Sequence, residues 1–141
     1  MTSTALPIVL AALFCLQPTT PPARALRHAR TIVAVASTED EAAALLVTGT
    51  RESSWRLGCV QGIGGAGTYG LGYGYRRWAC GPLKVQAMMS LQAYRDKGAP
   101  EAWDHAIIHY LGAKTIQEPE ARRRIALFEL TRERIACACC L

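Results

Sequence analysis

Apolar residues recur at helical spacing in four segments of the chain, separated by glycine, proline and polar residues. Ser37 or Thr38 is a suitable N-cap for the first segment, and Pro82 is a suitable first residue for the second. Gly98 and Gly112 follow the second and third segments, as expected where helices end. The four segments span about 37–53, 82–97, 100–112 and 119–135. This pattern predicts a mainly helical fold, and nothing in it indicates a parallel sheet.

A glycine-rich stretch, residues 58–81, lies between the first and second segments and holds nine of the twelve glycines. Backbone this rich in glycine favours tight turns, so we expect a loop or a short β-hairpin rather than a helix. Its aromatic residues are Tyr69, Tyr73, Tyr75 and Trp78. These rings either form a wall that binds a sugar or pack inward beneath a disulfide-stapled surface loop.

Residues 62–67 match the G-x-G-x-x-G spacing of dinucleotide-binding loops. That motif needs a strand before it and a helix that opens from it, whereas Thr-Tyr-Gly-Leu-Gly follows here. We therefore do not interpret the match as a nucleotide site, and the sequence predicts no cofactor.

The N-terminus has the organisation of an export signal. Residues 5–16 are apolar, and a proline-rich segment and the tripeptide 23–25, Ala-Arg-Ala, follow them. We expect residues 1–25 to be a cleavable signal peptide and 26–36 to be a linker, although no Lys or Arg precedes the apolar stretch. An uncleaved anchor or a buried helix is the alternative, and the stretch is too short to span a bilayer comfortably.

The chain has 141 residues, half of them hydrophobic, which suffices for one small domain with its own core. We expect this domain at residues 37–136, followed by a cysteine-rich tail at 137–141. The formal net charge of +5 either attracts polyanions such as cell-wall polymers or serves solubility alone. Arg122, Arg123 and Arg124 are expected on a solvated face, with a patch for an anionic polymer as the alternative. Basic and aromatic residues are not interleaved as nucleic-acid binding requires.

Six cysteines are many for a chain of this length. Cys59 and Cys80 bracket the glycine-rich stretch, and a bridge between them would stabilise an exported protein by about 3 kcal/mol. Pairing in the tail stays open, because Cys137, Cys139 and Cys140 could bind a metal, pair internally or pair with Cys59. No histidine neighbours the tail and no second cysteine pair has zinc spacing, so we predict no metal site.

Glu52 is the strongest candidate for chemistry. With Leu45 and Gly49 it occupies positions i, i+4 and i+7 of the first predicted helix, so it extends the buried face. A carboxylate at the end of this helix, just before the glycine-rich stretch, is expected to be half-buried at the lip of a cleft. Partial burial favours the protonated form of a carboxyl group, which suits a general acid near neutral pH.

Three short blocks occur in order along residues 40–115. They are Glu52-Ser53-Ser54-Trp55, Gly67-Thr68-Tyr69-Gly70-Leu71-Gly72-Tyr73 and His109-Tyr110-Leu111-Gly112. In this order they resemble the Glu-Ser-x-Phe, Gly-Ala-x-Gly-Leu-Met-Gln and Ala-Tyr-Asn-x-Gly motifs of soluble lytic transglycosylases and goose-type lysozymes, in the lysozyme-like superfamily.

The resemblance implies a lysozyme-like domain of the mainly α (α+β) class, with about four helices around a cleft beside the glycine-rich loop or hairpin. It implies that Glu52 is the sole catalytic acid and base of a lytic transglycosylase, or lysozyme-like muramidase, that cleaves peptidoglycan glycan strands. The residues that it implies for substrate contact are Ser53, Tyr69, Leu71, Tyr73 and Tyr110. It also implies that Tyr110 orients the glutamate or the sugar.

The chain departs from the family where substrate is bound. Gly72 and Tyr73 stand where the family has Met and Gln, and Leu111 replaces the Asn after the tyrosine. The family Gln touches substrate, so these changes bear on substrate contacts more than on the fold. One alternative is therefore a non-catalytic exported binding or inhibitory protein on the same fold. Another is an unrelated small disulfide-stabilised helical interaction protein.

The third predicted helix contains one acidic residue and two histidines that bear on chemistry. Asp104 is the acidic residue there that could act as a second carboxylate, and it lies one position off the inward face. His105 and His109 have a metal-capable i, i+4 spacing but lack a third ligand. We expect a secreted or periplasmic monomer, or a phage-associated one, without a stable membrane span after signal removal.

Overall fold

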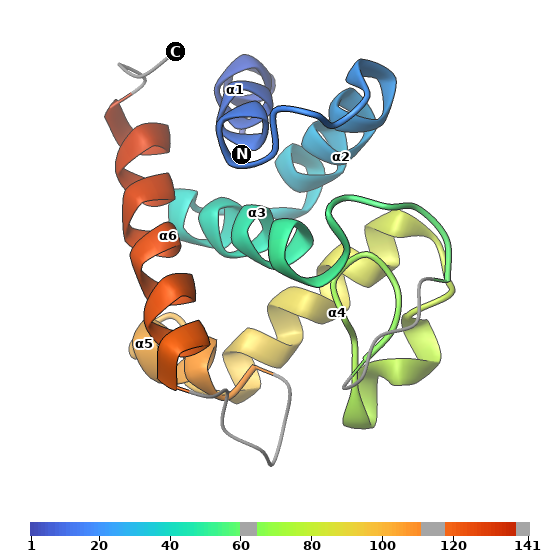
Figure 1. Ribbon diagram of the computed structural model, residues 1–141, viewed down its shortest axis with the longest axis vertical. Helices are drawn as coiled ribbons and strands as arrows, with labels where there is room; N and C mark the ends of the chain where they lie inside the picture. The colour runs from blue at the N-terminus through green and yellow to red at the C-terminus, as the bar shows by residue number, and fades with distance from the viewer. Residues whose placement is uncertain (60–64, 111–117, 138–141) are drawn as a thin grey trace.

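The computed structural model describes residues 1–59, 65–110 and 118–137, and this part of the chain is mainly helical (Figure 1). Its elements are η1 (Ser3–Ala5), α1 (Leu6–Leu16), α2 (Pro22–Val35), α3 (Glu39–Ser53), η2 (Tyr73–Trp78), α4 (Leu83–Asp96), α5 (Trp103–Ile108) and α6 (Glu118–Cys137). Helices α3, α4 and α6 correspond to three of the four segments predicted from apolar spacing, whereas α5 is shorter than the segment predicted at 100–112, because residues 100–102 and 109–110 form turns. The predictions about Leu111, Gly112, Cys139 and Cys140, and about the side chain of Tyr73, lie outside the described residues.

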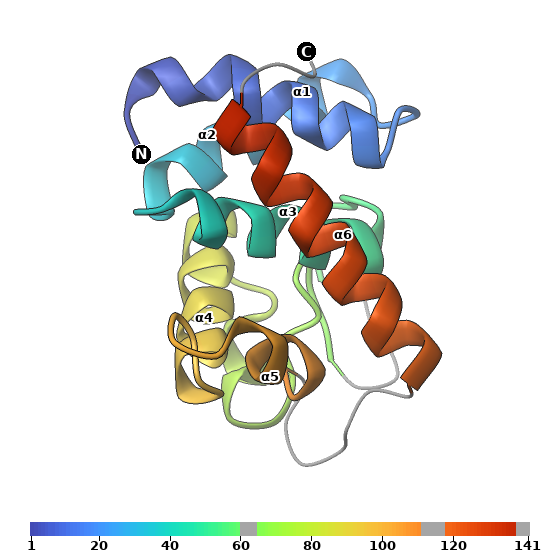
Figure 2. The ribbon, with the colours of Figure 1, turned by 90° about the vertical axis from the view of Figure 1, so that its left-hand side faces the viewer.

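Helix α3 is at the centre of the fold. Helices α1 and α2 lie on one side of it, α4 lies on the other, and α6 crosses its flank (Figure 1, Figure 2). Residues 42–49 of α3 are all buried, which fits their sequence of Ala, Leu, Val, Thr and Gly, because a helix that is apolar all round is enclosed by others. The Thr38 side chain accepts a hydrogen bond from the backbone N–H of Glu41, so α3 begins at one of the two predicted caps.

The N-terminal segment shares this hydrophobic core. Helix α1 buries Val9 and Leu13 completely and packs against α2, α3 and α6. Cleavage after Ala25 stays a prediction, and such a cut would fall in the first turn of α2. Among the described helices, α1 included, none is both long and apolar enough to cross a membrane.

Residues 26–36 were expected to form a linker, and the structure corrects this. Most of them belong to α2, which buries Ala25, His28, Ala29 and Ile32. These four residues occupy positions i, i+3, i+4 and i+7, the spacing of one helix face. The predicted cleavage site after Ala25 divides this periodicity between the predicted signal peptide and the predicted linker.

The chain reverses sharply after α3, and this reversal fixes the orientation of the helix end. Ser54 and Trp55 have positive φ values of 51° and 64°, and Trp55 is fully buried. Gly49 leaves room for the indole, because a Cβ at that position would overlap the Trp55 ring. The carbonyl of Trp55 accepts a hydrogen bond of 2.8 Å from Nε2 of His28 on α2.

Within the glycine-rich stretch, an antiparallel bridge joins Ala66 and Leu71 through two backbone hydrogen bonds of 3.0 and 2.8 Å. The intervening turn, residues 67–70, is called the glycine turn below. It needs positive φ values at Gly67 (76°) and Gly70 (59°), which glycine adopts without a steric cost. The backbone N–H of Thr68 donates to the side-chain oxygen of Gln86 on α4, at 2.9 Å. Helix α4 therefore holds the turn against the end of α3.

Candidate active site

Glu52 lies in the last turn of α3 and faces the glycine turn. Its side chain is 15 % exposed, so the carboxylate is largely but not completely removed from solvent. A Cβ on Gly70 would come within 2.5 Å of Glu52 Oε2 and 2.7 Å of its Cδ. The carboxylate thus packs directly on the backbone of Gly70, and this close approach requires glycine at that position.

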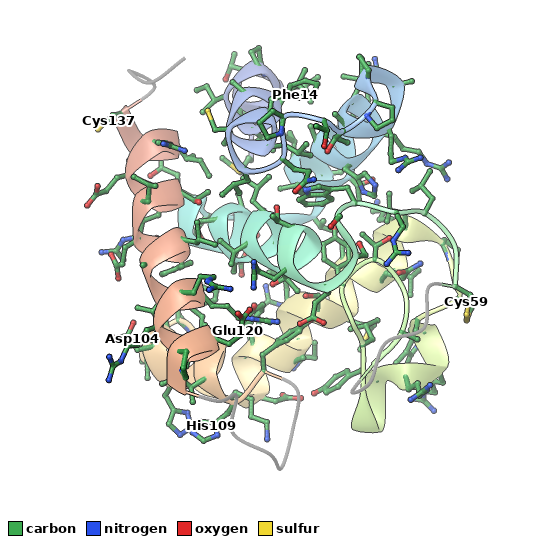
Figure 3. All side chains as sticks on the ribbon, viewed as in Figure 1. Phe14, Cys59, Asp104, His109, Glu120 and Cys137 are labelled. Carbon is green, nitrogen blue, oxygen red and sulfur yellow. A yellow bond between two sulfur atoms is a disulfide. The ribbon has the colours of Figure 1, made fainter. Side chains whose placement is uncertain are left out.

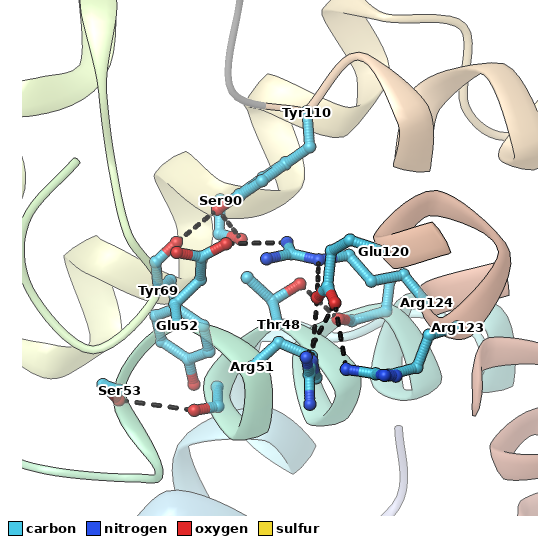
Figure 4. A network of polar contacts seen from close by, with 12 residues as sticks. Thr48, Arg51, Glu52, Ser53, Tyr69, Ser90, Tyr110, Glu120, Arg123 and Arg124 are labelled. Carbon is cyan, nitrogen blue, oxygen red and sulfur yellow. Dashed lines mark hydrogen bonds and ion pairs between the residues drawn. The ribbon is translucent and has the colours of Figure 1, made fainter. Parts of the chain in front are cut away.

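Arg124 on α6 is the ion-pair partner of Glu52 (Figure 4). Its Nη1 atom lies 2.6 Å from Glu52 Oε1, and the residue is only 7 % exposed. The prediction that residues 122–124 share a solvated face is therefore wrong for Arg124, whereas Arg122 and Arg123 are exposed. Burial acts to lower the pKa of the Arg124 guanidinium, but the charge of Glu52 and the hydrogen bonds to Glu120 outweigh it and raise that pKa.

A second carboxylate, Glu120 on α6, also pairs with Arg124 (Figure 4). Arg51 donates two hydrogen bonds to it, of 2.9 and 2.7 Å, and Arg124 Nε donates a third of 3.0 Å. Burial acts to raise the pKa of the Glu120 carboxyl, but the hydrogen bonds and charges of Arg51 and Arg124 outweigh it and hold the pKa below its usual value. Glu120 is therefore an ionised anchor for the arginines rather than an acid.

Tyr110 supports the glycine turn from the other side of the site (Figure 4). Its hydroxyl donates a 2.8 Å hydrogen bond to the backbone carbonyl of Tyr69 and accepts one of 2.7 Å from Ser90 on α4. The ring is 4 % exposed and stacks on Tyr94 with centroids 4.3 Å apart. Burial raises the pKa of Tyr110 well above its usual value, so the hydroxyl stays a neutral donor. A direct contact with a sugar stays a prediction.

The other residues expected to contact substrate are buried where the structure describes their side chains. Ser53 Oγ donates to the carbonyl of Gly49 at 3.3 Å. The Tyr69 ring packs edge-on against Trp55, and the Leu71 backbone forms the bridge to Ala66. These contacts stabilise the α3 end and the turn, and substrate binding by these residues stays a prediction.

Cys59 and Cys80 form a disulfide, with Cα atoms 4.6 Å apart. The bridge encloses the glycine turn, and Cys59 lies at the edge of the molecule opposite α6 (Figure 3). The pair is the one expected from the sequence, and its oxidation in the natural compartment stays a prediction.

Asp104 and His105 lie in α5 and His109 directly follows it, and no described contact joins them to Glu52. Asp104 is exposed (Figure 3). It lines an open cavity of about 560 Å³ whose lining also includes Asp40 and Glu129. The rings of His105 and His109 lie 4.3 Å apart. The described residues contain no group of three side chains that could hold a metal ion.

Sequence reasoning missed Arg124 and Glu120, although a signal was present for the first. Arg124 shares a helix face with Phe128, Thr131 and Ile135, at i, i+4, i+7 and i+11, and all four are buried. A cation on a buried face needs an anionic partner, and Glu52 was already assigned to a buried face. Glu120 lies one turn before Arg124, at the i, i+4 spacing that allows their ion pair.

The comparisons with known proteins find no match for this chain among protein-family models, curated proteins or solved structures. The resemblance to lytic transglycosylases therefore depends on the three blocks and on their positions in the fold. One residue from each block lies at this site: Glu52 contacts Gly70, and Tyr110 holds the carbonyl of Tyr69, which precedes Gly70.

Replacing Tyr110 by phenylalanine should lower the free energy of unfolding by about 1–3 kcal/mol, because two buried oxygens lose their partner. These are the carbonyl of Tyr69 and the hydroxyl of Ser90. Urea unfolding would measure the loss. Ser90→Ala is the matched control, since it removes one hydrogen bond and leaves the other, and it should cost less. Equal stability of Tyr110→Phe and the parent would show that the hydroxyl does not hold the turn.

Proposed function

We propose that this protein is a peptidoglycan-cleaving glycosidase, a lytic transglycosylase that uses Glu52 as its single catalytic acid and base. The observation that carries the proposal is the convergence of the three sequence blocks. The Glu52 carboxylate packs on Gly70, and the Tyr110 hydroxyl bonds to the residue before it. Residues that resemble one family's motifs, and that are distant in sequence, are thus linked through Tyr69 and Gly70 to one partly buried carboxylate.

The proposed reaction needs one carboxyl group and no water. Protonated Glu52 gives its proton to the glycosidic oxygen, and the electron pair of the broken C1–O bond stays with that oxygen. The Glu52 carboxylate then takes the proton of the sugar's own C6 hydroxyl, whose oxygen bonds to C1 and closes a 1,6-anhydro ring. Asp104 is exposed and has no described contact with Glu52, which supports a mechanism with a single carboxylate.

The remaining parts of the proposal follow from the substrate. Peptidoglycan lies outside the inner membrane, so the protein acts after export, in the periplasm or as a secreted or phage-associated protein. It works as a monomer on glycan strands. The net charge of +5 attracts the protein to anionic cell-wall polymers.

A non-catalytic peptidoglycan-binding protein on the same fold is the second candidate, and two features favour it. The ion pair with Arg124 occupies Glu52 Oε1 with a permanent cation, whereas a general acid must carry a proton. Tyr73 also stands where the family has a substrate-binding Gln. Both features would suit a site that has lost its chemistry.

Product analysis on purified peptidoglycan tests the proposal. We expect soluble fragments that end in anhydro-muramic acid, which mass spectrometry identifies by the absence of one water. Fragments with reducing ends would mean that water attacks and that a second carboxylate takes part. Binding to insoluble peptidoglycan without release of fragments would instead identify the non-catalytic protein.

A further inference from the structure

The two oxygens of Glu52 are in different environments. Oε1 is buried and pairs with Arg124, whereas Oε2 lies over the backbone of Gly70. Because Oε1 is inaccessible, the 15 % exposure of the side chain belongs to its other atoms. Of the two carboxylate oxygens, Oε1 is therefore closed to a ligand.

The position of Arg124 is itself fixed by Glu120 and Arg51. Its Nε atom donates to Glu120 Oε1 at 3.0 Å, and Arg51 binds both oxygens of Glu120. Arg51 directly precedes Glu52 in α3, and Glu120 lies one turn before Arg124 in α6. The four side chains therefore form one continuous series of ion pairs that links the end of α3 to the start of α6 (Figure 4).

We propose that Arg124 is a positioning residue for Glu52, which fixes Oε1 so that Oε2 is the oxygen that exchanges protons with the substrate. This inference rests on the proposed function of Glu52. It makes α6, which lies outside the three blocks of the resemblance, part of the active site. Glu120 and Arg51 act through Arg124 and do not touch the reacting atoms.

This arrangement stabilises the negative charge that Glu52 acquires during the proposed reaction. When Oε2 gives its proton to the glycosidic oxygen, Glu52 becomes an anion, and the guanidinium already lies 2.6 Å from Oε1. A charge that is in place before the reaction stabilises the new anion without reorganisation. Arginine suits this task, because its planar fork binds Glu52 through Nη1 and Glu120 through Nε at once.

Kinetics of Arg124→Met and Arg124→Lys on peptidoglycan test the proposal. We expect kcat to fall by about tenfold or more in the methionine variant with KM within about twofold of the parent, since orientation and not affinity is lost. Lysine keeps the charge and should recover part of kcat. Glu120→Gln should lower kcat less than Arg124→Met does. A folded Arg124→Met variant with the kcat of the parent would overturn the proposal.

Arg132→Met is the matched control, because Arg132 lies on the same helix and pairs with Glu129 on the surface. It should leave kcat and KM unchanged, and an equal loss of kcat in both methionine variants would mean that α6 matters only for stability.

Crystal structures of the parent and of Arg124→Lys, which retains a charge and a fold, give a readout without substrate. We expect Glu52 Oε1 to move from its position in the parent, and an unmoved carboxylate would overturn the proposal. An inactive parent overturns the proposed function, and the crystal structures still decide whether Arg124 holds Glu52.

Discussion

Replacing Glu52 by glutamine should abolish cleavage of peptidoglycan, with a loss of about 10³-fold or more in turnover. Glutamine has nearly the same shape and keeps an acceptor oxygen for Arg124, but it has no acidic proton. The reaction then lacks both its general acid and the base that takes the proton of the C6 hydroxyl. A zymogram and the rate of release of soluble fragments would measure the loss.

The control for this experiment is Glu101→Gln, the same substitution at an exposed carboxylate. It should leave turnover unchanged. Circular dichroism and melting temperature should show that the Glu52→Gln variant is folded, because Glu120 still binds the Arg124 guanidinium. A Glu52→Gln variant that clears cell walls as fast as the parent would end the catalytic interpretation of this residue.

Helix positions were predictable because apolar spacing and capping residues agree. The run at 42–49 is apolar on every side and forms the buried centre of α3, and Thr38 caps that helix. Helix α2 was not predicted, although its residues have helical spacing, because the predicted cleavage site after Ala25 divides it between an export signal and a linker. Distinguishing them required the tertiary contacts of His28 and Ile32.

The candidate site was predictable only in part. Glu52 was placed correctly on an inward face, and the glycine turn was placed next to it in the chain. The partner of Glu52, 72 residues away, was missed because Arg124 was assigned with Arg122 and Arg123 to a solvated face. The side chains of Ser53 and Tyr69 face inward. The Ser53 hydroxyl donates to the α3 backbone, and the Tyr69 ring packs against Trp55.

The protein should lose about 3 kcal/mol of stability as the pH falls from 6.5 to 4, through one residue, His28. This histidine is 0 % exposed and lies in the core between α2 and the reversal after α3. Burial lowers its pKa from 6.5 to about 4, against the hydrogen bond to the Trp55 carbonyl, and Arg24 and Arg27 lower it further. The Trp55 carbonyl can only accept a hydrogen bond, so Nε2 of His28 carries the proton. Nδ1 of the neutral ring is unprotonated and buried, and it has no hydrogen-bond partner among the described residues.

The sign follows from the two pKa values. Between pH 6.5 and pH 4 the unfolded chain binds a proton at His28 and the folded chain does not, so the unfolded state gains about 1.4 kcal/mol per pH unit. Above pH 6.5 the residue contributes no slope, and below pH 4 the loss is complete. Urea unfolding of the full chain at pH 7, 5.5 and 4 would measure this dependence.

His28→Gln is the decisive variant, because a glutamine amide can still donate to the Trp55 carbonyl but does not titrate. Its stability should fall by about 3 kcal/mol less than that of the parent between pH 7 and pH 4, whatever the carboxylates of the protein contribute to both. At pH 7 the variant is expected to be somewhat less stable, since the amide fills less of the space beside the Trp55 ring, 4.8 Å away from the imidazole in the parent. Parallel pH dependences of the two proteins would show that His28 is protonated as easily in the folded state as in the unfolded state, and that the packing of α2 on the α3 reversal does not exclude a charge.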